Sequence, residues 1–144
     1  MIRISTRTRY ALSALIELAQ HTEPLSIRKL AKLQGLPEKY LEQIFCCLTE
    51  AKLVESKRGA KGGYILTRDP EDITLLSIMQ AVDESVCSAP CINTKNPECP
   101  RGKESCNLNP LWQEVSEKIS GILNSYTLRE IIEECQRRDH GGKG

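Results

Sequence analysis

The chain has 144 residues, which suits one domain or a small domain with an appended arm, and only 4% of them are aromatic. Residues 1–68 hold twelve Lys and Arg against six Asp and Glu, whereas residues 69–144 hold eight against thirteen. A basic half joined to an acidic half indicates a module that binds a polyanion, with nucleic acid as the first candidate. No run approaches the ~18 apolar residues that cross a bilayer. Since Glu17 interrupts the first apolar stretch, a signal peptide is not expected, and we expect a cytoplasmic protein without membrane contact.

The first half of the chain shows helical periodicity. Apolar residues at helical spacing predict a first helix over residues 6–20. Ser26 is the expected N-cap of a second helix that Gly35 ends, and Pro37 suits the first turn of a third helix that runs to Ala51. Two helices joined by a short turn containing glycine are the layout of a helix-turn-helix.

A hairpin is expected directly after these helices. Residues 53–57 and 64–67 are β-prone, and the loop between them contains three glycines. The tip of this loop carries Arg58 and Lys61. A helix-turn-helix followed by a basic hairpin is the order of a winged helix, so residues 1–68 are predicted to be a winged helix-turn-helix DNA-binding region.

The second half is expected to be helical. Residues 69–86 are predicted to contain a connecting helix that Thr74 caps and that runs to about Asp83. A long helix is predicted to start at Asn109-Pro110, with Asn109 as its N-cap. Thr127 begins a capping box that opens a last helix within residues 109–139. Residues 140–144 are expected to be a disordered tail. The predicted fold class is therefore mainly α with a small β-hairpin wing.

The expected DNA-reading side chains lie on the third helix, because the second helix of a helix-turn-helix enters the major groove. Gln43 suits adenine, Glu42 suits the N4 donor of cytosine, and Lys39 suits guanine or a phosphate. On a lone helix the same residues would be only a solvated face, and a charged hairpin tip can serve solubility alone. The full set of candidate DNA contacts comprises Arg7, Arg9, Arg28, Lys29, Lys32, Lys39, Tyr40, Glu42, Gln43, Arg58 and Lys61.

Four of the seven cysteines are clustered in the run Cys87-x3-Cys91-x7-Cys99-x6-Cys106. This stretch is rich in loop-forming residues and poor in apolar ones, so a metal or disulfides are expected to hold it together. Because cytosolic thiols stay reduced, metal binding or redox sensing is the favoured interpretation for residues 87–108. The other three cysteines, Cys46, Cys47 and Cys135, are expected to be packing residues.

Several motifs occur in a characteristic order: Arg3-Ile4-Ser5, Arg9-Tyr10-Ala11, Tyr40-Leu41-Glu42-Gln43-Ile44, Arg58-Gly59-Ala60-Lys61-Gly62-Gly63-Tyr64 and Ala81-Val82-Asp83-Glu84. Over residues 1 to about 135 the chain resembles the IscR, NsrR and CymR family of bacterial winged-helix transcription regulators. The resemblance implies a homodimer in which the long helices of residues 109–139 pair. It also implies a pseudo-palindromic operator on double-stranded DNA, with half-sites about one DNA turn apart.

The resemblance also implies a cofactor. Members similar to IscR and NsrR hold an iron–sulfur cluster on three cysteines before the dimer helix, whereas members similar to CymR lack these residues. Cys91, Cys99 and Cys106 fall where the three ligands fall, although the intervals of seven and six residues are longer than is usual for the family. A 2Fe–2S cluster is favoured, with 4Fe–4S as the alternative.

The fourth ligand stays open at this point. IscR-like members use a histidine where this chain has Asn109, and NsrR-like members use a carboxylate of the partner chain where this chain has Arg9. Cys87 is an extra thiol that would complete an all-cysteine site, and an exogenous or partner-chain ligand is the other option.

The expected function is that of a homodimeric regulator, such as a repressor, that senses cluster status, redox state or nitric oxide. No catalytic grouping stands out, so an enzyme is not expected. One alternative keeps the DNA binding and replaces the cluster with zinc or a reversible dithiol. A second alternative is an iron–sulfur carrier or scaffold without DNA binding, which the basic first half disfavours.

Overall fold

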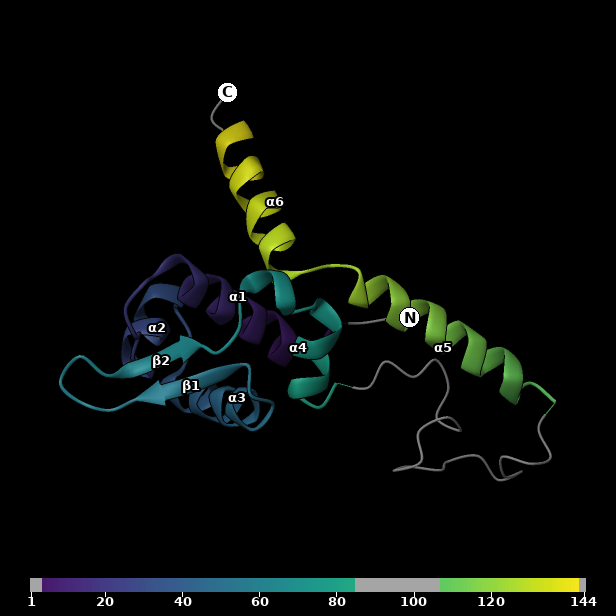
Figure 1. Ribbon diagram of the computed structural model, residues 1–144, viewed down its shortest axis with the longest axis horizontal. Helices are drawn as coiled ribbons and strands as arrows, with labels where there is room; N and C mark the ends of the chain where they lie inside the picture. Colours follow the sequence, from purple (N-terminus) through teal and green to yellow (C-terminus); the bar gives the residue numbers. More distant parts are fainter. Residues whose placement is uncertain (1–3, 85–106, 143–144) are drawn as a thin grey trace.

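Helices dominate the computed structural model, which describes residues 4–84 and 107–142 (Figure 1). The predicted class, mainly α with a small hairpin wing, is confirmed. The elements in chain order are α1 (Thr6–Gln20), α2 (Ile27–Gln34), α3 (Glu38–Glu50), β1 (Val54–Lys57), β2 (Gly63–Leu66), the 3-10 turn η1 (Pro70–Asp72), α4 (Leu75–Ala81), α5 (Asn109–Asn124) and α6 (Leu128–Gly141).

The first three helices form where local signals predicted them. The side chain of Ser26 accepts a hydrogen bond from the backbone of Lys29 and caps α2. Gly35 ends α2 in the left-handed region, at φ 65°. Pro37 lies immediately before α3 rather than in its first turn. The apolar faces of these helices enclose one core, whose largest fully buried side chains include Phe45, Leu15, Leu30, Leu41, Ile44 and Leu48.

The hairpin is held against the start of α2. Strands β1 and β2 pair antiparallel, from Val54 opposite Leu66 to Lys57 opposite Gly63. Tyr64 then forms an isolated bridge with Leu25 through two backbone hydrogen bonds of 2.8 and 3.1 Å. This bridge fixes the wing relative to the helix-turn-helix.

A second bridge attaches the C-terminal helices to the winged half. Thr74 and Thr127 are the N-caps of α4 and α6, each within a capping box, and the two residues pair antiparallel. Leu128 is fully buried and donates its backbone N–H to the carbonyl of Ile73 at 2.7 Å. From this junction, α5 and α6 extend away from the core in different directions (Figure 1).

Three predicted boundaries in the second half differ from the structure. Asn109 is the first residue of α5 and not its N-cap, a position that Leu108 occupies without a side-chain cap bond. Helix α4 ends at Ala81, before Asp83, whose φ of 64° is left-handed. Helix α6 continues to Gly141, so the predicted tail from residue 140 begins too early. Among the described residues, no helix is both long and apolar enough to cross a membrane.

Candidate nucleic-acid interface

Helix α3 presents a polar face opposite its core face. Leu41 and Ile44 are fully buried, whereas Lys39, Glu42 and Gln43 are exposed. This alternation is the one expected for a recognition helix, because the exposed side chains carry the donors and acceptors that read base edges. The structure therefore leaves three of the predicted DNA-reading residues free to meet a ligand from outside.

Tyr40 has a different environment from its neighbours on α3. It is half-buried, and its ring meets the ring of Tyr10 on α1 edge-on, with centroids 5.5 Å apart and an interplanar angle of 88°. Such pairs contribute packing energy beyond the area that they bury. Tyr40 thus helps to fix α3 against α1.

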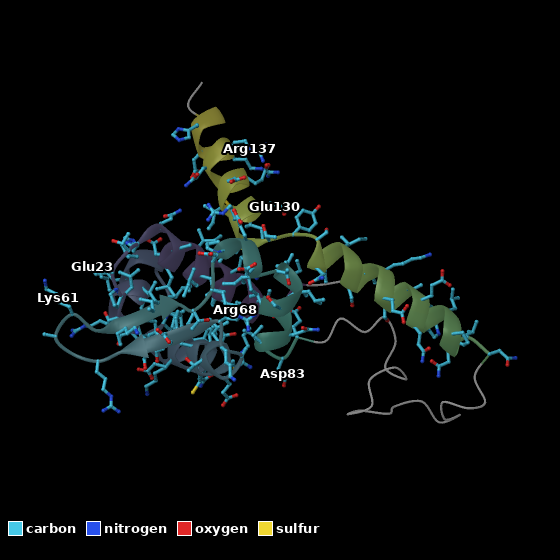
Figure 2. The ribbon with its side chains drawn as sticks, viewed as in Figure 1. Glu23, Lys61, Arg68, Asp83, Glu130 and Arg137 are labelled. Atoms are coloured by element: carbon cyan, nitrogen blue, oxygen red, sulfur yellow. The ribbon has the colours of Figure 1, made fainter. Side chains whose placement is uncertain are left out.

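The wing carries the second group of predicted contacts. Arg58 and Lys61 are exposed in the loop between β1 and β2. Figure 2 shows Lys61 at the far end of this loop, directed away from the core. Gly59 takes φ 116° in the same loop, and its carbonyl accepts a hydrogen bond from the backbone of Gly62 at 2.9 Å. A tight basic tip of this kind suits contact with phosphates or the minor groove.

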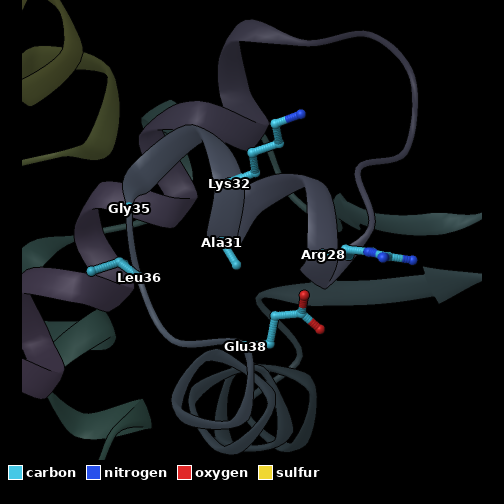
Figure 3. Close-up of a pocket in the computed structure, with 6 residues that line it drawn as sticks. All are labelled: Arg28, Ala31, Lys32, Gly35, Leu36 and Glu38. Atoms are coloured by element: carbon cyan, nitrogen blue, oxygen red, sulfur yellow. The ribbon is translucent and has the colours of Figure 1, made fainter.

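Helix α2 supplies further cations beside the recognition helix. Arg28, Lys29 and Lys32 are exposed. An open hollow of about 430 Å³ lies between α2 and the start of α3, and Figure 3 shows the charged ends of Arg28 and Lys32 pointing in different directions around it. Since the two cations do not converge, they form a spread positive surface. The hollow is lined by Arg28, Ala31, Lys32, Gly35, Leu36 and Glu38.

The two predicted cations of α1 have separate environments. Arg9 is exposed and donates to the hydroxyl of Thr6 at 3.1 Å. Arg7 is half-buried, and its Nη2 donates to Sγ of Cys47 on α3 at 3.1 Å. The Nε atom of Arg7 is also buried. Arg7 therefore joins α1 to α3 within the protein, a role that its sequence context did not indicate.

The packing role expected for Cys46, Cys47 and Cys135 is contradicted at two of these three positions. Cys46 and Cys135 are exposed, so the prediction is wrong for both within this chain. Cys47 is half-buried, and its Sγ accepts the hydrogen bond from Arg7. Helical spacing does indicate the exposure of Cys46, because the buried stripe of α3 runs through Leu41, Ile44, Phe45 and Leu48.

Glu84 contacts the start of α1, a role that the sequence analysis did not predict, since it named this residue only as part of a family motif. Its carboxylate accepts hydrogen bonds from the backbone N–H of Ser5 at 2.8 Å, the hydroxyl of Ser5 at 2.9 Å and the hydroxyl of Thr8. Burial raises the pKa of Glu84, but these hydrogen bonds outweigh burial and leave its pKa below the ordinary value. The carboxylate is thus held ionised at the first turn of α1.

The predicted cluster ligands Cys87, Cys91, Cys99 and Cys106 lie outside the described residues. Three or four thiols are a donor set that both iron–sulfur clusters and zinc accept. Within residues 4–84 and 107–142, no three His, Cys, Asp or Glu side chains converge on a common metal position. The chemistry of the donor set fits a metal centre in the cysteine-bearing segment, residues 85–106.

Most of the chain is similar in sequence to known transcriptional regulators. Residues 4–134 match the Rrf2 family model, described as "Iron-dependent Transcriptional regulator". The HTH-type transcriptional regulator IscR of Serratia proteamaculans is 37% identical over 133 residues, which cover 91% of this chain and 79% of that protein. The regulator of the same name from Photobacterium profundum is 35% identical over 144 residues, which cover 99% and 82%.

Solved structures agree with this match. CymR (YrzC), the global cysteine regulator of B. subtilis, has a TM-score of 0.73 at 33% identity, covering 93% of this chain and 98% of that one. T. potens IscR has a TM-score of 0.70 at 33% identity, covering 93% and 88%. The likeness includes both the winged half and the C-terminal helices.

Proposed function

The chain belongs to the Rrf2 family of transcriptional regulators, and we propose that it acts as a homodimer on a pseudo-palindromic DNA site under the control of an iron–sulfur cluster. It is a DNA-binding regulator and not an enzyme, as its relatives are named transcriptional regulators. That naming also sets aside a carrier without DNA binding. The observation that carries the proposal is the exposed polar face of α3 beside a basic wing.

In the proposed complex, each side chain has a chemical task. Gln43 pairs with the donor and acceptor of adenine, Glu42 accepts from N4 of cytosine, and Lys39 binds guanine or a phosphate. Arg58 and Lys61 on the wing contact phosphates or the minor groove. The exposed cations Arg9, Arg28, Lys29 and Lys32 add attraction to the backbone that does not depend on sequence.

The proposed dimer is supported by the apolar surface of α5. On this 16-residue helix, Leu111 is 47% exposed and Ile122 is 60% exposed. Val115 and Ile119 are only half-buried, although they lie at helical spacing between these two residues. A second copy of α5 would cover this stripe and place two copies of α3 on half-sites about one DNA turn apart.

The proposed cluster would be held by Cys91, Cys99 and Cys106, with Cys87 as the candidate fourth ligand. When bound, a cluster supplies a centre whose redox state and integrity respond to oxidants, iron supply and nitric oxide. Helix α5 begins at Asn109, so the positive end of its dipole lies close in sequence to Cys106 and favours the thiolate forms. A 2Fe–2S cluster is favoured over 4Fe–4S.

The experiment for the cofactor is an anaerobic absorption spectrum with iron and sulfide assays. It compares the wild type, Cys87→Ala and, as a matched control, Cys46→Ala. Visible charge-transfer bands with matching iron and sulfide are expected in the wild type and in Cys46→Ala, and weaker or shifted bands in Cys87→Ala. A wild type that stays colourless after anaerobic reconstitution would contradict the cluster and favour zinc or a dithiol on the same thiols.

The experiment for DNA reading uses two substitutions with different expected signatures. Gln43→Ala should weaken the binding free energy for the preferred DNA site by about 1–3 kcal/mol and relax selectivity at one base position. Lys61→Ala should weaken binding on every sequence and reduce the salt dependence by about one phosphate contact. Equal effects of the two variants on all sequences would contradict the roles assigned to them.

A further inference from the structure

Glu84 ties the end of the α4 region to the first turn of α1, across 79 residues of sequence. Its two carboxylate oxygens accept three hydrogen bonds, two from Ser5 and one from Thr8. Ser5 is the N-cap of α1, and its hydroxyl also accepts from the backbone of Thr8 at 3.1 Å. Thr8 is fully buried. The carboxylate therefore holds both the N-cap residue of α1 and the buried Thr8 of its first turn.

Arg7 lies in the same turn of α1, and its side chain contacts α3. Its guanidinium donates to Sγ of Cys47 at 3.1 Å, and Cys47 lies one helical turn after Gln43 on α3. Glu84, the first turn of α1, Arg7 and α3 are thus joined by direct contacts. Each link is a packed or hydrogen-bonded contact of the kind that can carry coupling between sites.

The position of Glu84 in the sequence connects these contacts to the cysteine-bearing segment, residues 85–106. Glu84 is followed at once by the cysteine-bearing segment, and Cys87 is three residues further along. A short carboxylate side chain cannot keep three donors if its own backbone is displaced, because hydrogen bonds weaken steeply outside a narrow range of distance and angle. A change in the segment that moves residue 84 would release Ser5 and Thr8 together.

We propose that Glu84 is a positioning residue that transmits the state of the cysteine-bearing segment to α3, through the first turn of α1 and the Arg7–Cys47 contact. The inference rests on the proposed function for the event at the cysteines. Two motifs that the function had left without a role, the one ending in Ser5 and the one ending in Glu84, become the two sides of one contact. The consequence is a difference in DNA affinity between the two states of the segment.

The first test needs no cluster. Hydrogen exchange is measured on the cluster-free full chain for the wild type, Glu84→Gln and the control Glu114→Gln, whose carboxylate pairs with Lys118 on the surface of α5. Glu84→Gln keeps the shape of the side chain and removes its charge. Faster exchange is expected in peptides from both the first turn of α1 and α3, and only in this variant. Unchanged exchange in either peptide would overturn the route, whatever the cysteines bind.

The second test measures the ratio of DNA affinities between the cluster-loaded and cluster-free forms. Couplings of this kind commonly reach about 5–150-fold. The ratio should fall toward one in Glu84→Gln and in Cys47→Ala, and keep its wild-type value in the neighbouring control Cys46→Ala, with equal cluster content by absorption in all four proteins. A wild-type ratio retained in Glu84→Gln would overturn the inference. A wild type that binds no cluster would instead refute the proposed function, and the exchange measurement would still decide the role of Glu84.

Discussion

Gly63 is a position of the wing at which the structure leaves no room for a side chain. It opens β2 with φ 153°, a conformation that residues with a side chain rarely adopt. A Cβ at this position would lie 2.4 Å from the carbonyl carbon of Leu25, 2.5 Å from its oxygen and 2.7 Å from the backbone nitrogen of Ser26. All three atoms belong to the backbone, so no side chain can rotate away to make room.

The substitution Gly63→Ala must therefore strain the backbone of β2 and also push it away from residues 25 and 26. Separation would lose the two hydrogen bonds between Leu25 and Tyr64, each with a net value of about 1 kcal/mol. Forcing a side chain into this backbone region costs about 1–3 kcal/mol. We expect a loss of about 3–5 kcal/mol in the free energy of unfolding, a large part of the roughly 5–15 kcal/mol that stabilises a folded domain.

The assay is urea denaturation followed by circular dichroism, with Gly121→Ala as the control. A Cβ at Gly121 meets nothing within 4 Å, and the residue lies inside α5. That control should be neutral or gain up to about 1 kcal/mol, because alanine favours a helix interior over glycine. A Gly63→Ala protein within about 1 kcal/mol of the wild type would refute the reasoning, because the expected loss is at least about 3 kcal/mol.

Three further predictions concern the caps, the helices and the contact of Glu84. Thr127→Ala removes the capping box of α6 and should lower the unfolding free energy by about 1 kcal/mol in urea, and an unchanged midpoint would speak against the cap. Ile122→Asp should convert a dimer into a monomer in analytical ultracentrifugation, whereas a variant that still sediments as a dimer would show that α5 does not form the interface. The folded-state pKa of Glu84 lies below the ordinary 4.5, so this carboxylate stabilises the fold at neutral pH and loses that effect as the pH falls through the lowered pKa. The stability difference between wild type and Glu84→Gln should therefore shrink in acid, and a difference that is constant with pH would contradict the assignment.

The helices of the winged half were predictable because their signals are local. The burial of Leu41 and Ile44 follows from helical spacing alone, and the side chain of Ser26 caps α2 as expected. The family resemblance added the pairing of helices and the cluster, neither of which follows from periodicity. The hairpin strands differ from the prediction by one residue: β1 begins at Val54 rather than at residue 53, and β2 spans Gly63–Leu66, where Gly63 pairs with Lys57.

Other features of the structure depend on contacts that sequence patterns do not show. Arg7 and Arg9 read alike as basic residues two positions apart, yet Arg7 bonds to a residue 40 positions away. Glu84 reaches its partners across 79 positions. The start of α5 differs for a local reason: Asn109 is a favourable N-cap by type, but it is buried as the first residue of the helix.

The central claim is that this chain is a DNA-binding regulator controlled through its cysteines, and one measurement addresses it most directly. A duplex is selected from random-sequence DNA with the wild-type protein. Its dissociation constant is then measured anaerobically, at one stated salt concentration, for the cluster-loaded and cluster-free forms. We expect the selected sequence to contain two half-sites about one turn apart, and the two affinities to differ by at least about fivefold. Equal affinities for the two forms, with the cluster confirmed by absorption, would contradict the account.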